Sequence, residues 1–261
     1  MGRGRLALIL AAADDASADA VGRGLRERGC RVVRAGAAEL ALAGWQHAPD
    51  GDGTRVDLPD GTRLDDRDIG VVLNRLDGID LPQFARAPAE DRDYAVAEFS
   101  ALLASWLNGL DVPVANPPGG DNAWAASLHP LGWHALAAAH GLATGDFVVA
   151  SSVRGGACAG LERVGGSAFP RGCDVAGWYR PASVGGAVSW AWVFGEACVG
   201  RPAAGLAESC AAFVQALGLG YAALGFVPDG AAWRLVEVAP RPPLDGAHVT
   251  AQCVDWLEGW L

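Results

Sequence analysis

The first 33 residues alternate an apolar strand, a helix and a second apolar strand. Arg5 to Leu10 has the composition of a buried strand, and Cys30 to Val33 has that of the next one. Between them, Ser17 is placed to cap a helix that Gly29 ends. Two strands joined by one helix within about 30 residues form a right-handed βαβ unit, so we expect the chain to begin with an open α/β sheet.

The pattern up to about residue 145 continues this architecture. Pro59-Asp60-Gly61 is a turn sequence between two short strand patterns and predicts a hairpin. Residues 88–110 predict one long helix, because large apolar residues recur every three or four positions, namely Tyr94, Phe99, Leu102, Leu103, Trp106, Leu107 and Leu110. Glu98 is interpreted as part of its solvated face. The other predicted elements are strands at 54–58, 62–64, 69–73 and 112–115 and a helix at 130–140.

The texture changes near residue 145 to short strands with many glycines. A second Pro-Asp-Gly turn, at 228–230, separates two strand patterns. We therefore predict a leading α/β domain over 1–145 and a trailing α+β domain over 146–261. The strands predicted in the trailing domain are 147–150, 187–194, 197–200, 222–227 and 233–238, and the predicted helices are 206–217 and 249–261.

The charge balance excludes several functions. The formal net charge is -10, and all 20 basic residues are arginine, so the chain contains no lysine. Schiff-base chemistry, pyridoxal-phosphate chemistry and a Walker-type phosphate loop all need a lysine and are excluded. Basic residues are not concentrated anywhere, which argues against a nucleic-acid partner. No apolar run approaches the roughly 20 residues of a membrane helix, so we expect no membrane insertion.

Six cysteines stand at positions 30, 158, 173, 198, 210 and 253, and no pair forms a CxxC motif. Free thiols in a reducing cytoplasm fit this spacing best. Arg3 and Arg5 before an apolar run imitate a secretion signal, but Asp14 and Asp15 interrupt a run that is already short for one. We therefore expect a cytoplasmic protein whose first strand is not part of a cleaved leader.

The order of motifs resembles a known family. Helix, strand 222–227, the turn 228–230, strand 233–238 with Glu237, and the exit Ala239-Pro240-Arg241-Pro242-Pro243 follow the end of an ATP-grasp domain. The chain is similar here to ribosomal-protein glutamate ligases and graspetide maturases, and the leading elements follow the same order in that family. The resemblance implies a pre-ATP-grasp-like α/β domain followed by a shortened ATP-grasp-like α+β domain.

The departures from the family concern its Mg-ATP site. In the family, two Mg²⁺ ions are held by a carboxylate on each paired strand and by an asparagine, and lysines hold the phosphates. This sequence keeps the metal candidate Glu237, but Gly225 and Ala239 stand where the resemblance would put the other two ligands. Arg171 stands roughly where a phosphate-binding lysine would be and can hold a phosphate as a fork. Mg and ATP are therefore expected as cofactors only if the remaining residues suffice.

Other candidates follow from their position at strand ends and on strand faces. Arg241 can contact an anionic ligand, although an exposed arginine after a strand is the alternative. Polar residues Asn74, Arg75 and Asn116 end two strands and can line one cleft or cap turns. Trp190 and Trp192 share a strand face, which can receive a peptide or simply pack against a helix.

Two hypotheses about function remain. The first is a binding or accessory protein with an ATP-grasp-like scaffold, a pseudoenzyme that holds a peptide, a small-molecule carboxylate or a partner protein during peptide or natural-product modification. The second is an active ligase that forms an acyl-phosphate and passes it to an amine or hydroxyl, with Glu237, Arg171 and Arg241 as the catalytic candidates. The loss of two metal ligands and of lysine favours the first.

Overall fold

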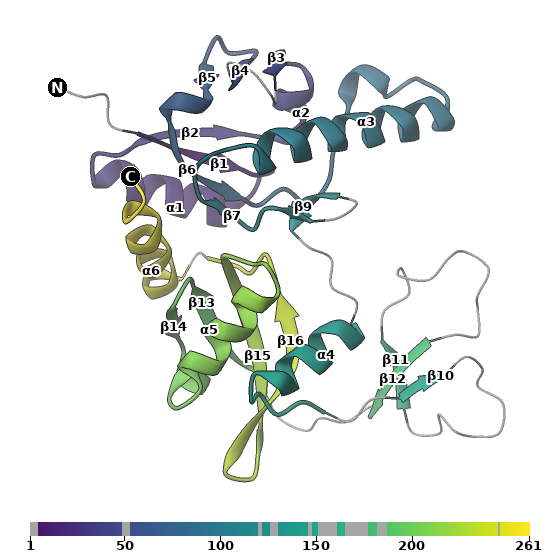
Figure 1. Cartoon of the computed structure of the whole chain (residues 1–261), viewed down its shortest axis with the longest axis vertical. Helices are drawn as coiled ribbons and strands as arrows, with labels where there is room; N and C mark the ends of the chain where they lie inside the picture. The colour runs from purple at the N-terminus through teal and green to yellow at the C-terminus, as the bar shows by residue number, and fades with distance from the viewer. Residues whose placement is uncertain are drawn as a thin grey trace. The chain divides into compact units, whose positions relative to one another are not determined.

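The computed structural model describes residues 5–48, 53–119, 122–125, 130–145, 148–150, 161–164, 177–181, 187–244 and 246–261. The chain forms two compact units (Figure 1). The first contains residues 1–127, 214–222 and 240–261, and the second contains 128–213 and 223–239. The domain limits 1–145 and 146–261 stay a prediction, since the compact units are discontinuous in sequence.

The first unit is built on a parallel sheet, as the βαβ pattern predicts. Its strand order is β2-β1-β6-β7, with β1 at Leu6–Leu10, β2 at Arg31–Ala35, β6 at Ile69–Asn74 and β7 at Val114–Ala115. Every residue of β1 and β6 is buried. A central parallel strand buried on both faces needs a layer of structure on each side.

Alternation along β1 assigns these two layers. Leu6, Leu8 and Leu10 join one core with residues of α2, Ala37–Ala41, and of α3, Ala89–Asn108. Ile9 points to the opposite face, where it approaches Gly22 of α1, Ala16–Glu27. The last helix, α6 at Ala247–Glu258, packs along α1, and Arg28, the C-cap residue of α1, pairs with Asp255 at 2.5 Å. The first unit is therefore a three-layer α/β structure, in agreement with the sequence.

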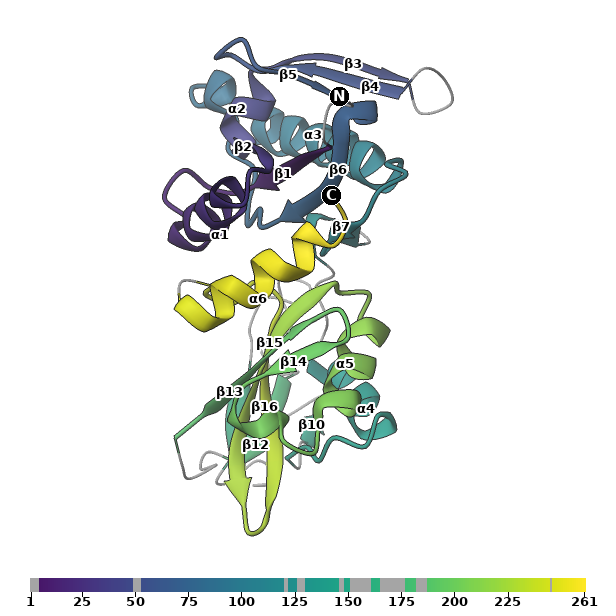
Figure 2. The same ribbon diagram turned by 90° about the vertical axis from the view of Figure 1, so that its left-hand side faces the viewer.

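The predicted hairpin is confirmed and extended by a third strand (Figure 2). Strands β4, Gly53–Asp57, and β5, Arg63–Asp65, pair across the Pro59-Asp60-Gly61 turn. β3, Gly44–Ala48, adds to the other edge of β4 and was missed because it is short and does not alternate between apolar and polar residues. Short 3-10 helices at Asp66–Asp68 (η1) and Pro82–Phe84 (η2) complete the connections.

The start of α1 differs from the prediction. Asp15, not Ser17, is the N-cap, and its carboxylate accepts a hydrogen bond from the Ala18 amide at 3.0 Å. Ser17 is buried inside the first turn, where its hydroxyl accepts from the Leu244 amide at 2.8 Å. The prediction was wrong because Ser17 serves a contact 227 residues away, which the local pattern does not show.

Only part of the apolar face, or stripe, predicted for α3 is buried in the core. Leu103, Trp106 and Leu107 are at most 1% exposed, as predicted. Tyr94, at the other end of the same stripe, is 68% exposed, so the prediction of one continuously buried face was wrong. The parallel sheet and its hairpin layer end before the helix does, and the first turns of α3 extend past that core.

The second unit contains a sheet of order β14-β13-β15-β16, in which the pairs β13–β14 and β15–β16 are antiparallel. Its strands are β13 at Ser189–Phe194, β14 at Ala197–Val199, β15 at Tyr221–Asp229 and β16 at Ala232–Ala239. The first two residues of β15 group with the first unit, as do the last three of helix α5, Ala207–Ala216. Helix α4 spans Pro130–Ala139, and the 3-10 helix η3 spans Arg201–Ala203.

Two smaller sheets complete the described structure. One has the order β10-β12-β11, with strands at Val148–Ala150, Gly177–Pro181 and Leu161–Val164. The other pairs β8, Pro118–Gly119, with β9, Asn122–Ala125. Within the described ranges, we find no helix with both the length and the apolar character that a bilayer crossing requires.

Candidate functional site

The polar residues predicted at the ends of β6 and β7 meet in the first unit. Asn74 is the last residue of β6 and Asn116 follows β7, and the Asn74 side-chain amide donates to the Asn116 carbonyl at 2.9 Å. Both residues are buried, with exposed fractions of 3% and 1%. Neighbouring parallel strands bring their carboxyl ends to the same sheet edge, which is why residues 42 positions apart come together.

The side chain of Asn116 forms hydrogen bonds with two later segments of the first unit, at residues 220–221 and at residue 240. Its oxygen accepts from the Gly220 amide at 2.9 Å and the Tyr221 amide at 3.1 Å, and its nitrogen donates to the Pro240 carbonyl at 2.5 Å. Asn116 has φ of 60°, in the left-handed region that asparagine tolerates better than most residues. Asn116 therefore fixes the backbone at the start of β15 and the backbone that follows β16.

Arg75 is a buried cation held by a network of partners. It is 5% exposed, and its Nε lies 2.8 Å from Asp15 Oδ2. Its Nη1 donates to the Pro242 carbonyl at 3.0 Å and to the Tyr221 hydroxyl at 3.4 Å. Asp15 was not among the predicted partners, although a signal exists: Asp15 follows β1 and Arg75 follows β6, the neighbouring strand. In this structure the guanidinium binds the protein itself.

The Arg75–Asp15 pair changes the acidity of the groups around it. Burial opposes ionisation of Asp15, but hydrogen bonds from Arg75 and from the Ala18 amide outweigh it and lower the pKa of this carboxyl. Burial raises the pKa of the Tyr221 phenol well above its usual value. Tyr221 is therefore neutral and Asp15 ionised over the whole physiological range, which suits a fixed structural network.

This network predicts a pH dependence of stability. Because the folded-state pKa of Asp15 is depressed, its contribution is present above the unfolded pKa of about 3.9 and is lost as pH falls through the folded value. We expect Asp15→Asn to lower the thermal midpoint at pH 7 and to lose less further stability than the parent between about pH 4 and pH 2. Thermal unfolding monitored by circular dichroism measures both.

Asp14→Asn is the matched control for this prediction, because Asp14 is exposed and directly precedes Asp15. It should keep the stability and the acid profile of the parent. Equal acid sensitivity of the parent and Asp15→Asn would show that the buried pair does not contribute.

Arg241, predicted to contact an anionic ligand, is engaged in an ion pair. Its Nη2 lies 3.0 Å from Asp77 Oδ2, and its Nη1 donates to the Arg75 carbonyl at 3.3 Å. Burial and the nearby Arg75 lower its pKa. With 38% of its side chain exposed, Arg241 keeps a solvent-accessible part, and its role toward a ligand stays a prediction.

Glu237, the predicted metal ligand, lies on an accessible face of the second unit. It is exposed on β16 and pairs directly with Gly225 of β15. A β-bulge at this point leaves Val236 as the extra residue, so that Gly225 faces Glu237 instead of Val236. Ala239 lies two residues further along the same face and pairs with Ala223. One carboxylate is thus flanked by a glycine and an alanine.

Apolar side chains occupy the space beside Gly225. A Cβ placed on this glycine would lie 3.0 Å from Val188 Cγ1 and 3.2 Å from the Trp190 ring. Trp190 and Trp192 are both half-buried, whereas Ala191 and Val193 between and beyond them are fully buried. The two tryptophans therefore share the Glu237 face, as the strand alternation predicts.

The three positions that the resemblance assigned to metal binding carry one side chain with an oxygen donor. Mg²⁺ prefers several oxygen ligands, and Glu237 is the one carboxylate among Gly225, Glu237 and Ala239, the positions that the resemblance assigned to metal binding. Among the residues that the structure describes, no group of three or more His, Cys, Asp or Glu side chains is placed to hold a metal ion. Arg171, the predicted phosphate ligand, lies outside the described residues.

Several solved structures with a similar fold are ATP-grasp ligases. The ligase PsnB complexed with a minimal precursor, Mg and ADP matches with a TM-score of 0.76 at 15% identity, over 97% of both chains. The macrocyclase MdnC bound with precursor peptide MdnA, from Microcystis aeruginosa MRC, matches with 0.72 at 12% identity, over 97% of this chain and 99% of that one. No protein-family model and no curated protein matches the sequence.

The chain therefore has the ATP-grasp ligase fold, which confirms the predicted architecture. Within that fold, its structure is similar to ligases associated with ribosomally made peptides. A further example is the RiPP-associated ATP-grasp ligase of Chryseobacterium gregarium in complex with ADP and a leader and core peptide, with a TM-score of 0.71 at 12% identity over 98% of this chain and 97% of that one.

Proposed function

We propose that the chain is an ATP-grasp-like accessory protein that binds a peptide and lacks the usual Mg-ATP chemistry. The observation that carries this proposal is the pairing of Glu237 with Gly225 beside Ala239, which leaves one carboxylate where the fold's ligases would need several oxygen ligands. The packing of Val188 and Trp190 beside Gly225 supports it, because apolar groups fill the space that a second carboxylate would need.

The absence of lysine supports the same proposal. Nucleotide phosphates carry several negative charges that a binding site must neutralise, and the chain has arginine alone for this purpose. Of the arginines singled out by sequence, Arg75 is committed to Asp15 and Arg241 is paired with Asp77.

A peptide is the proposed partner because several structures with this fold are complexes with precursor or leader peptides. Trp190 and Trp192 offer a half-buried aromatic surface in the second unit, and aromatic faces bind extended peptide side chains well. The proposed role is to hold such a peptide during its modification by another enzyme.

Calorimetric titration of ATP and ADP, with and without Mg²⁺, tests the proposal. We expect no Mg²⁺-dependent binding in the micromolar range, and we expect Glu237→Gln to leave the titration unchanged. Micromolar binding that requires Mg²⁺ and disappears in Glu237→Gln or in Arg171→Ala would overturn the proposal. The protein would then be an active carboxylate–amine or carboxylate–hydroxyl ligase in which arginine replaces the usual lysine.

A further inference from the structure

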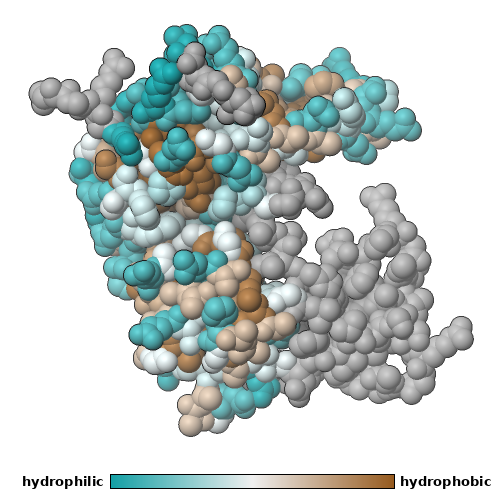
Figure 3. Space-filling model, in the orientation of Figure 1, coloured by the Kyte–Doolittle hydropathy of each residue, from teal (hydrophilic) through white to brown (hydrophobic). Residues whose placement is uncertain are grey.

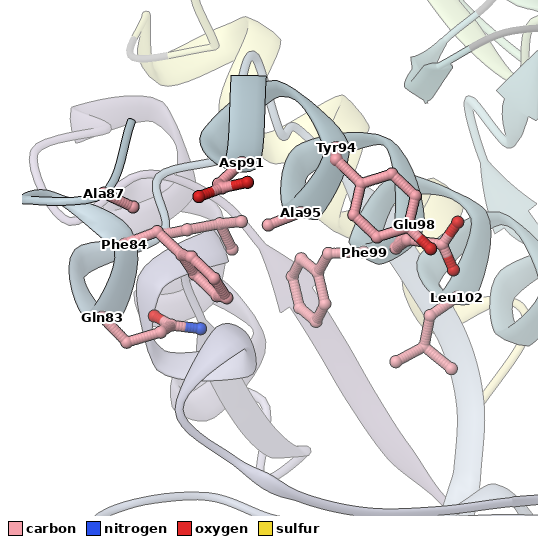
Figure 4. A pocket seen from close by; sticks show the side chains of 10 residues that line it. Gln83, Phe84, Ala87, Asp91, Tyr94, Ala95, Glu98, Phe99 and Leu102 are labelled. Atoms are coloured by element: carbon pink, nitrogen blue, oxygen red, sulfur yellow. The ribbon is translucent and has the colours of Figure 1, made fainter. Parts of the chain in front are cut away.

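The first unit carries an open apolar groove between helix α3 and the segment around η2 (Figure 4). Its volume is about 650 Å³. Leu81, Phe84 and Ala87 form one wall, and Ala95, Phe99 and Leu102 of α3 form the other. We call this surface the α3 groove. The small side chains of Ala87 and Ala95 leave hollows that larger apolar side chains of a ligand can fill.

The α3 groove is formed by the part of the α3 stripe that extends past the core. Phe99 and Leu102 are half-buried, and Tyr94 beside them is 68% exposed. In Figure 3, apolar residues lie among hydrophilic ones along the part of the first unit formed by α3. Contiguous apolar surface of this kind, bordered by polar residues, is typical of an interaction site.

The edge of the α3 groove is acidic. Asp91 and Glu98 line it from α3, and no arginine or histidine is among its lining residues. Seven residues separate the two carboxylates, which is about two helical turns, so both lie on the same side of α3 at a separation of roughly 10 Å. None of the ion pairs within the described part of the chain involves Asp91 or Glu98.

We propose that the α3 groove binds an amphipathic helical segment of a partner, with an apolar face and basic residues at its margin. The apolar face fills the hollows at Ala87 and Ala95, and the basic residues pair with Asp91 and Glu98. A helix lying in an apolar groove is a recurrent mode of peptide recognition. A second copy of this chain docked through α3 would bring two acidic helices together, which repulsion disfavours.

The dimensions of the α3 groove define the partner segment. From Asp91 to Leu102 the groove follows α3 for about 17 Å, which equals three turns of a helix. A segment of about 12 residues covers this length, and two basic residues seven positions apart match the two carboxylates.

Fluorescence anisotropy with a designed peptide tests this proposal. The probe is a labelled helix-forming peptide of about 14 residues with leucine and phenylalanine on one face and arginines seven positions apart. A second probe carries glutamates in place of the arginines. We expect micromolar binding of the basic peptide and at least tenfold weaker binding of the acidic one.

Two variants of the protein locate the binding. Asp91→Lys combined with Glu98→Lys should weaken the basic peptide at least tenfold and strengthen the acidic one. Glu90→Lys combined with Asp93→Lys makes the same change in net charge on exposed positions of α3 outside the groove lining and should weaken binding of the basic peptide much less than the groove variant does. Ala95→Trp, which fills a hollow, should abolish binding of the basic peptide.

Several results would overturn the proposal. Failure of the basic peptide to bind, equal affinity for both peptides, or an equal loss in the groove and control variants would each do so. A concentration-dependent dimer in sedimentation that Ala95→Trp dissociates would assign the α3 groove to a second copy instead. The proposal concerns a different surface from that of Glu237, so its outcome is independent of the nucleotide titration.

Discussion

Replacing Arg75 with methionine should lower the free energy of unfolding by about 3–5 kcal/mol. Arg75 is 5% exposed, and its loss leaves Asp15 as a half-buried carboxylate without its cation. The Pro242 carbonyl and the Tyr221 hydroxyl also lose their hydrogen-bond donor. Methionine keeps much of the volume, so the effect measures the lost polar contacts. Chemical denaturation followed by circular dichroism gives the change.

Arg63→Met is the matched control. Arg63 also forms an arginine–aspartate pair, with Asp57 at 2.5 Å, but its side chain is 67% exposed. Solvent screens exposed pairs, which therefore contribute little to stability, so the control should remain close to the parent. Similar losses in the two variants would mean that burial does not determine the importance of the Arg75 network.

Gly200→Ala should destabilise the second unit by about 3 kcal/mol or more. Gly200 follows β14 with φ of 124° and ψ of 164°, a conformation that is almost restricted to glycine. A Cβ at this position would lie 2.3 Å from the Trp190 carbonyl oxygen and 3.0 Å from the Ala191 Cα. These are backbone atoms of the neighbouring strand, so relief requires β13 and β14 to separate. Thermal unfolding of the purified variant measures the loss.

Gly205→Ala separates conformational strain from steric overlap. Gly205 also has a positive φ, 85°, but nothing lies within 4 Å of the position of its Cβ. The cost should be the left-handed backbone alone, about 1–2 kcal/mol. If Gly200→Ala costs no more than this control, the close approach to Trp190 is not a constraint on the sheet.

Most elements of the fold were predictable because their signals are local. The strands on either side of Pro228-Asp229-Gly230 and the long helix α3 follow from turn chemistry and apolar spacing. The short helix α2 and the short strand β3 have neither signal. The end of the core along α3 was also unpredictable, because Tyr94 belongs to the same stripe as Trp106 and differs from it only in tertiary surroundings.

The candidate site shows the same division. Alternation places Trp190 and Trp192 on one face, and the adjacency of parallel strand ends brings Asn74 to Asn116. The register at Glu237 is different. Counting back from the turn, where Asp229 pairs with Ala232, an unbroken hairpin would set Gly225 opposite Val236. The bulge shifts this pairing by one residue, and the local sequence contains no feature that predicts the bulge.

The discontinuous first unit affects the order in which the chain can fold during synthesis. Arg75 and Asn116 are translated early, but the backbone groups that satisfy them belong to residues 220–242. The surface of α1 that packs against α6 likewise stays uncovered until α6, at 247–258, has been synthesised. While the ribosome is still making the second unit, the first therefore holds an incompletely paired buried guanidinium. Its final, stable form must await the emergence of the last segment, so fragments cut near residue 127 would omit part of their own core.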